Sequence, residues 1–230
     1  MALKEEKQIL DLFNQLRVAD VRDGMDWNMM HHYGTMSFDI RPLFRAKAVG
    51  IARTCRYVAY EGPIPPMNQK EYTEWSDWYY SNVCTYPWIS EIEDGDFIVI
   101  DQSGLNVGLM GSNNTLEGIR NGARGYVTNG GVRDTDEIIL QNIPFWSKSI
   151  AQSMVQGRLR FDAKDVPVNV GGVAVYPGDI IVADGDGVIA VPRKLCFEVA
   201  EYASRELRKD KTSRRKLYEE VGYKLDNTVL

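Results

Sequence analysis

One pattern of apolar residues framed by aspartate and glycine occurs twice, and it constrains the fold more than any other feature of the chain. The stretch DGDFIVIDQSG (residues 94–104) is echoed by PGDIIVADGDG (residues 177–187). Each copy has a Gly-Asp turn, four apolar residues, and then Asp and Gly, which is typical of a buried strand entered from a turn. Because the pattern occurs only twice, it indicates two similar strand entries and not a solenoid repeat.

The segment between the two copies alternates between helical and strand patterns. GSNNTLEGIRNGARGYVTNGGVRDTDEIILQNIPFW (residues 111–146) reads as loop, helix, strand, Gly-Gly turn, helix and strand. Helical spacing also opens the chain, and one long charged helix is expected from Leu195 to about Val221. This alternation within a short span predicts an α/β fold.

A proline-rich stretch and an aromatic helix interrupt the first half of the chain. EGPIPPMN (residues 61–68) carries three prolines and is expected to be a loop. The residues after it place Tyr72, Trp75, Tyr79 and Val83 at helical spacings of three and four. We expect these aromatic side chains to pack on the core or on a subunit partner. A nucleic-acid stacking platform would need more Lys and Arg than this mostly acidic stretch provides.

Composition limits the partners and the compartment. The 230 residues suffice for one large α/β domain, and 27 Lys and Arg against 32 Asp and Glu give a net charge of −5, which argues against a nucleic-acid partner. The three cysteines form no C-x-x-C pair and are expected to be reduced thiols in a cytoplasmic protein. Charges near the N-terminus argue against a signal peptide, and no apolar run approaches the ~18 residues of a membrane span.

The stretch GSNNT, Gly111 to Thr115, allows two compatible interpretations. Asn114 followed by Glu117 fits a capping box that opens the next helix. A helix N-terminus also has backbone N–H groups without partners and the positive end of the helix dipole, so it can bind a carboxylate. Because a cap satisfies only some of those N–H groups, both interpretations can hold.

The stretch NGGVRDTDEI is ambiguous in a similar way. Asp134 followed by Glu137 fits a capping box, but capping does not explain Arg133, whose charge is unfavourable at a helix N-terminus unless an anion lies there. Gly130 and Gly131 permit a tight turn and a close approach to a ligand. Arg provides a fork for a carboxylate, and Asp provides a hard oxygen for Mg²⁺ or Mn²⁺. A helix cap and half of a functional site both remain open.

Other patterns give weaker signals. The two histidines, His31 and His32, are adjacent, and adjacent side chains on a helix point too far apart to bind one metal. The run from Asp184 to Gly187 lacks the spacing and the closing Glu of a calcium loop. The sequence has no G-x-G-x-x-G and no P-loop, so nothing favours a nucleotide cofactor.

Taken together, these segments resemble the RraA-like family. This family contains the regulator of ribonuclease activity A and the divalent-metal-dependent 4-hydroxy-4-methyl-2-oxoglutarate aldolases. The resemblance runs from RVADVRDGMD (residues 17–26) to ADGDGVIAVP (residues 183–192), most of the chain. It is strongest over GARGYVTNGGVRDTDEI (residues 122–138) and VPVNVGGVAVYPGDIIVADGDGVIAVP (residues 166–192).

The resemblance implies a fold, an assembly and domain limits. The expected fold is a compact RraA-like α/β sandwich, with central mixed sheets flanked by helices, over residues 1–194. An insertion at about residues 58–88 is longer than the family pattern and is expected to reshape the pocket or the subunit surface. Residues 195–230 are expected to form a C-terminal helix and tail that pack on a neighbouring subunit. The expected assembly is a homotrimer or a trimer-based hexamer with active sites between subunits.

The resemblance also implies a chemistry for the ambiguous stretches. In the aldolases, the residue matching Asp134 coordinates Mg²⁺ or Mn²⁺, and the residue matching Arg133 binds the 2-oxo acid and stabilises the enolate. The loop matching Gly111, Ser112, Asn113 and Asn114 binds the substrate carboxylate through its backbone N–H groups. The expected reaction is retro-aldol cleavage of a 4-hydroxy-2-oxo acid with release of pyruvate, and oxaloacetate decarboxylation is an expected side activity.

One departure from the family leaves alternatives open. The aldolases usually carry an acid after the loop glycine, where this chain has Ser112, and a hydroxyl cannot supply the negative charge. A second family acid comes from a neighbouring subunit's C-terminal helix, and Glu206 or Asp210 fits that role. The alternatives are a metal-dependent dehydratase or tautomerase of a sugar-derived 2-oxo acid, and a non-catalytic regulator that binds a ribonuclease.

Overall fold

The computed structural model describes residues 2–230, with side chains from residue 4 onward. The strands are β1 (Arg41–Pro42), β2 (Ala48–Ala59), β3 (Asp96–Asp101), β4 (Gly108–Met110), β5 (Gly125–Val132), β6 (Phe145–Ile150), β7 (Leu159–Lys164), β8 (Val168–Val170), β9 (Val173–Val175), β10 (Ile180–Asp184) and β11 (Gly187–Val191). The helices are α1 (Ala2–Phe13), α2 (Val18–Trp27), α3 (Gln69–Asn82), α4 (Ser112–Asn121), α5 (Thr135–Leu140) and α6 (Cys196–Val221), with short 3₁₀ turns at Ile89–Glu91 and Arg193–Leu195.

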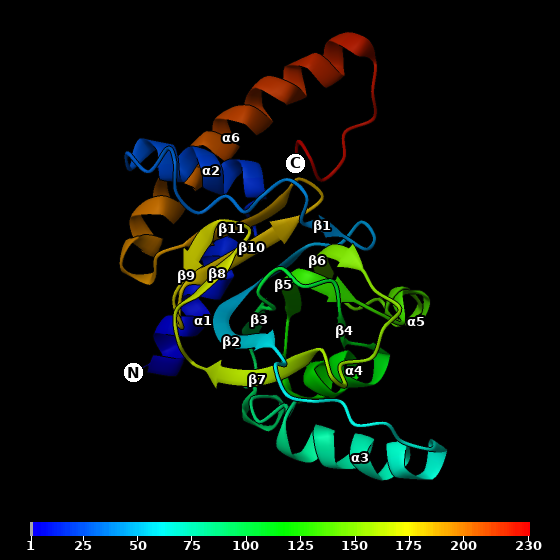
Figure 1. Cartoon of the computed structure of the whole chain (residues 1–230). Helices are drawn as coiled ribbons and strands as arrows, with labels where there is room; N and C mark the ends of the chain where they lie inside the picture. Colours follow the sequence, from blue (N-terminus) through cyan, green and yellow to red (C-terminus); the bar gives the residue numbers. More distant parts are fainter. Residues whose placement is uncertain (1) are drawn as a thin grey trace.

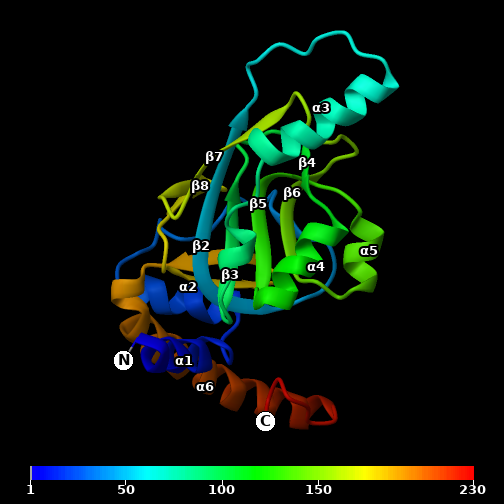
Figure 2. The same ribbon diagram turned by 90° about the horizontal axis from the view of Figure 1, so that it is seen from below.

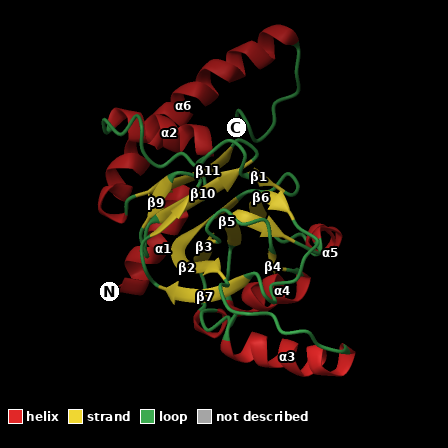
Figure 3. Ribbon diagram, in the orientation of Figure 1, coloured by secondary structure: helices red, strands yellow, loops and turns green. Residues whose placement is uncertain are grey.

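Most strands belong to one mixed sheet that curves until it is nearly closed (Figures 1 and 3). The strand order is β1-β6-β5-β3-β2-β10-β11, with β4 paired to β5 and β7 paired to β2. Strands β2, β3, β5 and β6 run parallel to their neighbours in that series, whereas β10, β11, β7 and β1 add antiparallel pairs. Helices flank the sheet, which confirms the predicted α/β class.

The two echoed stretches form β3 and β10, which pair with opposite edges of β2. The aspartate of each Gly-Asp turn closes that turn in the same way. Asp96 Oδ2 accepts from the Glu93 amide at 2.9 Å, and Asp179 Oδ2 accepts from the Tyr176 amide at 2.9 Å. Burial raises the pKa of Asp179 above its usual range, although hydrogen bonds from the Tyr176 and Arg193 amides oppose the shift. The repeated pattern is therefore two copies of one turn-to-strand entry.

The apolar core has three parts, separated by the sheet. One lies on the side of the sheet that faces α3, α4 and α5, and it includes Trp88, Tyr79 and Phe145. A second is centred on Trp146, whose indole N–H donates to the Asp184 carbonyl at 2.9 Å. The third joins β10 and β11 to α1, α2 and α6. The three cysteines are buried and free, as predicted, and burial raises the pKa of Cys84 to about 12.

The first turns of helix α6 pack against the body of the protein, and its later turns extend beyond that body (Figures 1 and 2). Its early residues Val199, Ala200 and Ala203 are buried with α1 and α2. Gly24 of α2 permits this contact, because a Cβ there would lie 2.5 Å from the Val199 carbonyl oxygen. The bounds of α6 match the predicted helix. In the described part of the chain, no helix is both long and apolar enough to cross a membrane.

Carboxylates gather where α2 faces α6, and this predicts a pH effect on stability. Burial, and then the charges of neighbouring acids, raise the pKa of Asp23; those acids are Asp20, Asp210, Asp26 and Glu206. A raised folded-state pKa adds stability that is complete below the unfolded pKa of ~3.9 and is lost as pH rises through the folded value. Asp23→Asn should therefore raise the melting temperature at pH 7.5 by about 1–2 °C.

Thermal unfolding of wild type and Asp23→Asn at pH 7.5 and pH 3.5 measures this effect. The difference should be smaller at pH 3.5, because the raised pKa favours the protonated form of Asp23 there, and should also shrink in 1 M NaCl because salt screens the repulsion. Asp11→Asn on α1 is the control outside the cluster. A lower melting temperature for Asp23→Asn than for wild type at pH 7.5 would show that the aspartate is a net stabilising residue.

Candidate functional site

Parallel pairing brings the two ambiguous stretches together. Strands β4 and β5 run parallel, with Gly108 opposite Gly131 and Met110 opposite Val132. The Arg133 amide then donates to the Met110 carbonyl at 3.0 Å. Because the carboxyl ends of parallel strands meet at one edge of a sheet, the residues that follow each strand lie side by side. The start of α4 therefore lies beside the pair that precedes α5.

Asp134 is turned toward that neighbouring loop by an unusual backbone conformation. It occupies the N-cap position of α5 with φ 54° and ψ 41°, the left-handed region, where non-glycine residues are uncommon. Its side chain makes no capping hydrogen bond to α5; instead, Oδ2 accepts from the Ser112 amide at 3.3 Å. The predicted capping box with Glu137 is therefore wrong, since the carboxylate turns away from the helix that it precedes.

Two glycines make room for the Arg-Asp pair. Arg133 Nε donates to Asp134 Oδ1 at 3.1 Å, and both side chains are 34% exposed. A Cβ on Gly108 would lie 2.8 Å from Arg133 Cδ, and a Cβ on Gly111 would overlap Asp134 Oδ2. Gly108 on β4 and Gly111 just after β4 are therefore the glycines that leave space for the Arg133 and Asp134 side chains. Gly130 and Gly131, predicted as a turn, instead belong to β5 where its pairing with β6 shifts in register.

Helix α4 presents its N-terminus to the same space. It begins at Ser112 with Gly111 at the N-cap, so the predicted capping box at Asn114 is wrong by three positions. The first hydrogen bond of the helix joins the Thr115 amide to the Gly111 carbonyl at 3.1 Å. The amides of Ser112, Asn113 and Asn114 therefore have no carbonyl partner within the helix, as expected for a carboxylate-binding loop.

A cavity of about 230 Å³ lies at this junction. Its lining includes five residues that the sequence singled out, namely Gly111, Asn113, Asn114, Arg133 and Asp134. Ser112 is not among the lining residues and approaches Asp134 through its backbone amide. The structure thus brings the predicted residues to one place.

Sequence reasoning missed a second set of lining residues. Tyr80, Tyr86, Gly108, Leu109 and Met154 complete the lining, and the two tyrosines belong to the insertion at residues 58–88. The Tyr86 hydroxyl donates to the Leu109 carbonyl at 2.9 Å. Burial and the neighbouring Cys84 thiol raise the pKa of Tyr86 well above its usual range, so this hydroxyl stays protonated. The aromatic spacing of α3 signalled a packed face but not this wall.

The oxygen ligands at the cavity suit a hard divalent cation. Asp134 offers one carboxylate, and Asn113 and Asn114, which also line the cavity, carry amide oxygens. Mg²⁺ keeps several waters and binds through one or two carboxylates plus substrate oxygens, so this set fits Mg²⁺ or Mn²⁺. Among the residues described, no group of three His, Cys, Asp or Glu side chains could hold a metal unaided. Further ligands would have to come from substrate, water or another chain.

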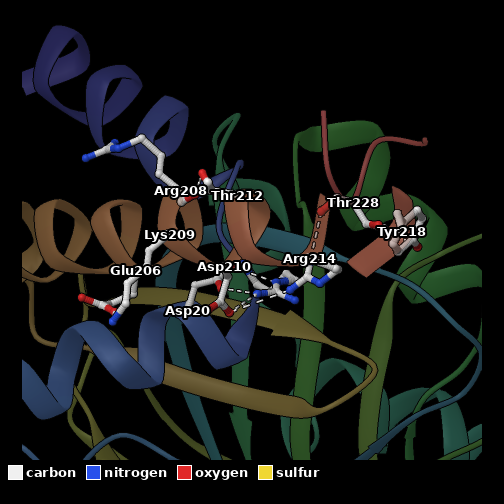
Figure 4. Close-up of polar contacts among 10 residues, drawn as sticks. Asp20, Glu206, Arg208, Lys209, Asp210, Thr212, Arg214, Tyr218 and Thr228 are labelled. Carbon is white, nitrogen blue, oxygen red and sulfur yellow. Dashed lines mark hydrogen bonds and ion pairs between the residues drawn. The ribbon is translucent and has the colours of Figure 1, made fainter. Parts of the chain in front are cut away.

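The two candidate acids of α6 lie away from this cavity. In both overall views α6 is well separated from the turn between β4 and α4 (Figures 1 and 2). Glu206 is 16% exposed and contacts Arg205 and Lys209 at 3.2 and 3.3 Å. Asp210 is 53% exposed and lies 3.8 Å from both Arg17 and Arg214 (Figure 4). Neither acid joins Asp134 within one chain.

The amino-acid sequence matches a family model and several named relatives. The model, RraA-like and described as Aldolase/RraA, matches residues 18–190. A Thermus thermophilus 4-hydroxy-4-methyl-2-oxoglutarate aldolase is 33% identical over 43% of this chain and 60% of its own. A Deinococcus radiodurans protein, provisionally given the same aldolase name, is 39% identical over 40% of this chain and 58% of its own. The matches thus span under two thirds of these two relatives.

Solved structures show the same fold over nearly the whole chain. An uncharacterised Pseudomonas syringae protein has a TM-score of 0.73 at 25% identity and covers 97% of this chain and 98% of its own. A Streptomyces coelicolor protein, described as an unusual member of the RNase ES inhibitor RraA family, has a TM-score of 0.72 at 23% identity. It covers 90% of this chain and 96% of its own.

Proposed function

Because the chain belongs to the RraA-like family, described as Aldolase/RraA, we propose that it is a divalent-metal-dependent lyase acting on a 2-oxo acid. The reaction is retro-aldol cleavage of a 4-hydroxy-2-oxo acid, with release of pyruvate. The observation that carries this proposal is the junction of Arg133 and Asp134 with the N-terminus of α4 around one cavity. Aldolase-named relatives support the same reaction class.

In this mechanism the start of α4 binds the carboxylate of the substrate. The amides of Asn113 and Asn114 have no carbonyl partner within the helix and lie at the positive end of its dipole. Arg133 adds a full positive charge, and its Nε contact with Asp134 at 3.1 Å orients the guanidinium. The substrate is thereby held by its 2-oxo-carboxylate end, with C4 directed to the rest of the cavity.

Bond cleavage then develops negative charge beside Arg133. As the C4 hydroxyl loses its proton to a water molecule, C4 becomes a carbonyl carbon and the C3–C4 bond breaks. The electron pair moves between C2 and C3, so the charge collects on the C2 oxygen as an enolate. Arg133 stabilises this charge electrostatically, and a proton returned to C3 gives pyruvate. Decarboxylation of oxaloacetate passes through the same enolate.

Asp134 is the residue that would hold Mg²⁺ or Mn²⁺ in this site. A bound divalent cation supplies Lewis-acid polarisation of the 2-oxo group and lowers the barrier to enolate formation. The remaining protein groups position the substrate and bind its charges. Ser112 stands where the family's aldolases carry an acid, so this position adds no negative charge to the site.

The proposal includes a homotrimer or a trimer-based hexamer. The first turns of α6 pack within the chain, whereas its later part extends past the body (Figure 1). A neighbouring copy's α6 would bring Glu206 or Asp210 to the cavity and complete its set of acids. This arrangement accounts for a site whose own chain provides a single carboxylate at the metal position.

Metal removal tests the proposed function. Pyruvate release is measured for the full chain with 4-hydroxy-2-oxo acids and oxaloacetate, with Mg²⁺ or Mn²⁺ and after EDTA treatment. We expect turnover with metal, loss of at least 100-fold with EDTA, and recovery when metal is restored, because one carboxylate without its cation gives little electrostatic stabilisation. Turnover that is insensitive to the chelator would contradict the metal-dependent mechanism.

Two alternatives predict different results in that assay. A dehydratase or tautomerase of a sugar-derived 2-oxo acid would need metal but would release no pyruvate, and the missing acid at Ser112 favours this variant. A non-catalytic regulator would turn over none of these acids and would bind a ribonuclease, as the description of the Streptomyces structure suggests for that protein. Pull-down with purified ribonuclease, with and without EDTA, separates the regulator from both enzymes.

A further inference from the structure

The insertion at residues 58–88 is anchored to the loop that leads away from the site. Its helix α3 buries Tyr79 completely, and the Tyr79 hydroxyl donates to the Leu159 carbonyl at 2.7 Å. One turn earlier, the Ser76 hydroxyl accepts from the Gln156 amide at 2.7 Å, and Gln156 is only 3% exposed. These buried polar contacts fix the position of α3 at the edge of the molecule (Figure 2).

This anchored helix brings an aromatic wall to the cavity. Tyr80 follows Tyr79 directly, lines the cavity and is 39% exposed. Tyr86 also lines it, and its hydroxyl is already bound to the Leu109 carbonyl at 2.9 Å, which leaves its ring as the available surface. Leu109 and Met154 add aliphatic and thioether surface. Met154 belongs to the same loop as Gln156, so the contacts that hold α3 also hold both sides of this wall.

The lining of the cavity includes two chemical kinds of side chain. Charged and amide groups, namely Arg133, Asp134, Asn113 and Asn114, make up one part of its lining. Two tyrosines, a leucine and a methionine line it as well, together with two glycines. The proposed function assigns the polar part to the 2-oxo-carboxylate end and the cation. The C4 end of the substrate would then lie against the apolar side chains of the lining.

Resting on that proposed function, we propose that the insertion makes the site selective for 2-oxo acids whose C4 end is uncharged and apolar, either aromatic or branched aliphatic. A carboxylate placed against these side chains would lose its hydration without gaining a charged partner from them. An apolar group would lose unfavourable contact with water and would pack against the two rings. Tyr80 and Tyr86 are specificity-determining residues in this proposal.

Binding of two non-cleavable probes to the full chain tests the proposal. Isothermal titration with Mg²⁺ compares 2-oxo-4-phenylbutanoate, which has an apolar end, with 2-oxoglutarate, which has a carboxylate end. Neither probe carries a 4-hydroxyl, so binding is measured without retro-aldol cleavage. We expect wild type to bind the phenyl probe about tenfold or more tightly, the scale of discrimination by an apolar pocket.

A charge-switch variant and a matched control make the test specific. Tyr80→Arg adds a cation to the wall and should lower the preference for the phenyl probe by at least about tenfold. Tyr72→Arg is the control, because Tyr72 lies on the same helix with the same 39% exposure and does not line the cavity. It should leave the preference unchanged. Circular dichroism of both variants verifies that α3 is retained.

The outcomes separate this proposal from the proposed function. Equal or tighter binding of 2-oxoglutarate by wild type overturns the specificity, as does an equal shift in both arginine variants. Exchange of the pyruvate C3 hydrogens in D₂O with Mg²⁺ reports enolate formation independently of the C4 end. If the C3 hydrogens exchange but the phenyl probe is not preferred, the proposed lyase function is supported and the proposed specificity is overturned. If the phenyl probe is preferred but the C3 hydrogens do not exchange, the proposed lyase function is overturned. The claim that apolar 2-oxo acids are substrates is then overturned as well.

Discussion

Asp134→Asn should lower metal-dependent turnover by at least about 1,000-fold, which corresponds to about 4 kcal/mol of lost transition-state stabilisation. The substitution keeps the size of the side chain but removes the only carboxylate that the described residues contribute to the lining of this cavity, which is the proposed metal ligand. Asn tolerates the left-handed backbone that Asp134 adopts at φ 54°, so the fold should be retained. The measurement is pyruvate release with Mg²⁺, beside Mn²⁺ binding followed by paramagnetic resonance.

Asp136→Asn is the matched control for this prediction. Asp136 lies two positions further along in the first turn of α5, is exposed, and is not part of the cavity lining. It should retain turnover within about twofold, since removing its charge changes only the field at the helix end. If Asp134→Asn retained turnover within threefold of wild type, Asp134 would be excluded as the metal ligand.

Elements with strong local patterns could be predicted from the sequence. The Gly-Asp turn, the apolar run and the exit aspartate identified β3 and β10, because each turn is closed by its own aspartate three residues after the amide that it binds. The long helix α6 followed from its periodicity. What no local pattern indicated is that β3 and β10 both pair with β2, a relation that depends on the chain returning after about 80 residues.

The start of α4 could not be predicted locally, because its cap comes from elsewhere. Asn114 and Glu117 match the spacing of a capping box, yet the helix begins at Ser112, whose amide donates to Asp134 after β5. Likewise, Gly130 and Gly131 match a turn, but they lie in β5, where neighbouring side chains such as Gln102 leave no room for a Cβ. In both cases a contact from a distant segment overrides a plausible local pattern.

Long-range contacts also explain why half of the site lining was missed. Arg133 and Asp134 were identified because an arginine at a helix N-terminus requires an explanation. Tyr80 and Met154 carry no such signal, since an exposed aromatic or methionine residue is common on any surface. Their place at the cavity depends on how α3 docks, through Tyr79 and Gln156, on residues far along the chain.

Gly111→Ala should lower turnover about 100-fold while the protein remains folded. Gly111 has extended backbone angles, φ −132° and ψ −175°, which alanine adopts without strain. The added Cβ would, however, overlap Asp134 Oδ2. Because the aspartate can rotate, the clash should be relieved by moving the carboxylate away from the Ser112 amide, at little cost to stability. The displaced carboxylate would no longer be in position for the cation, so the loss should appear in turnover and in metal affinity.

Gly185→Ala is the matched control, because a Cβ there would also meet the end of a flexible charged side chain, that of Arg45, outside the cavity. It should retain turnover within about twofold, and both variants should unfold within about 2 °C of wild type. A crystal structure of Gly111→Ala would show whether Asp134 has moved. Full turnover in that variant would mean that the carboxylate functions equally well away from the Ser112 amide. The close approach of Gly111 to Asp134 would then be a packing feature with no role in catalysis.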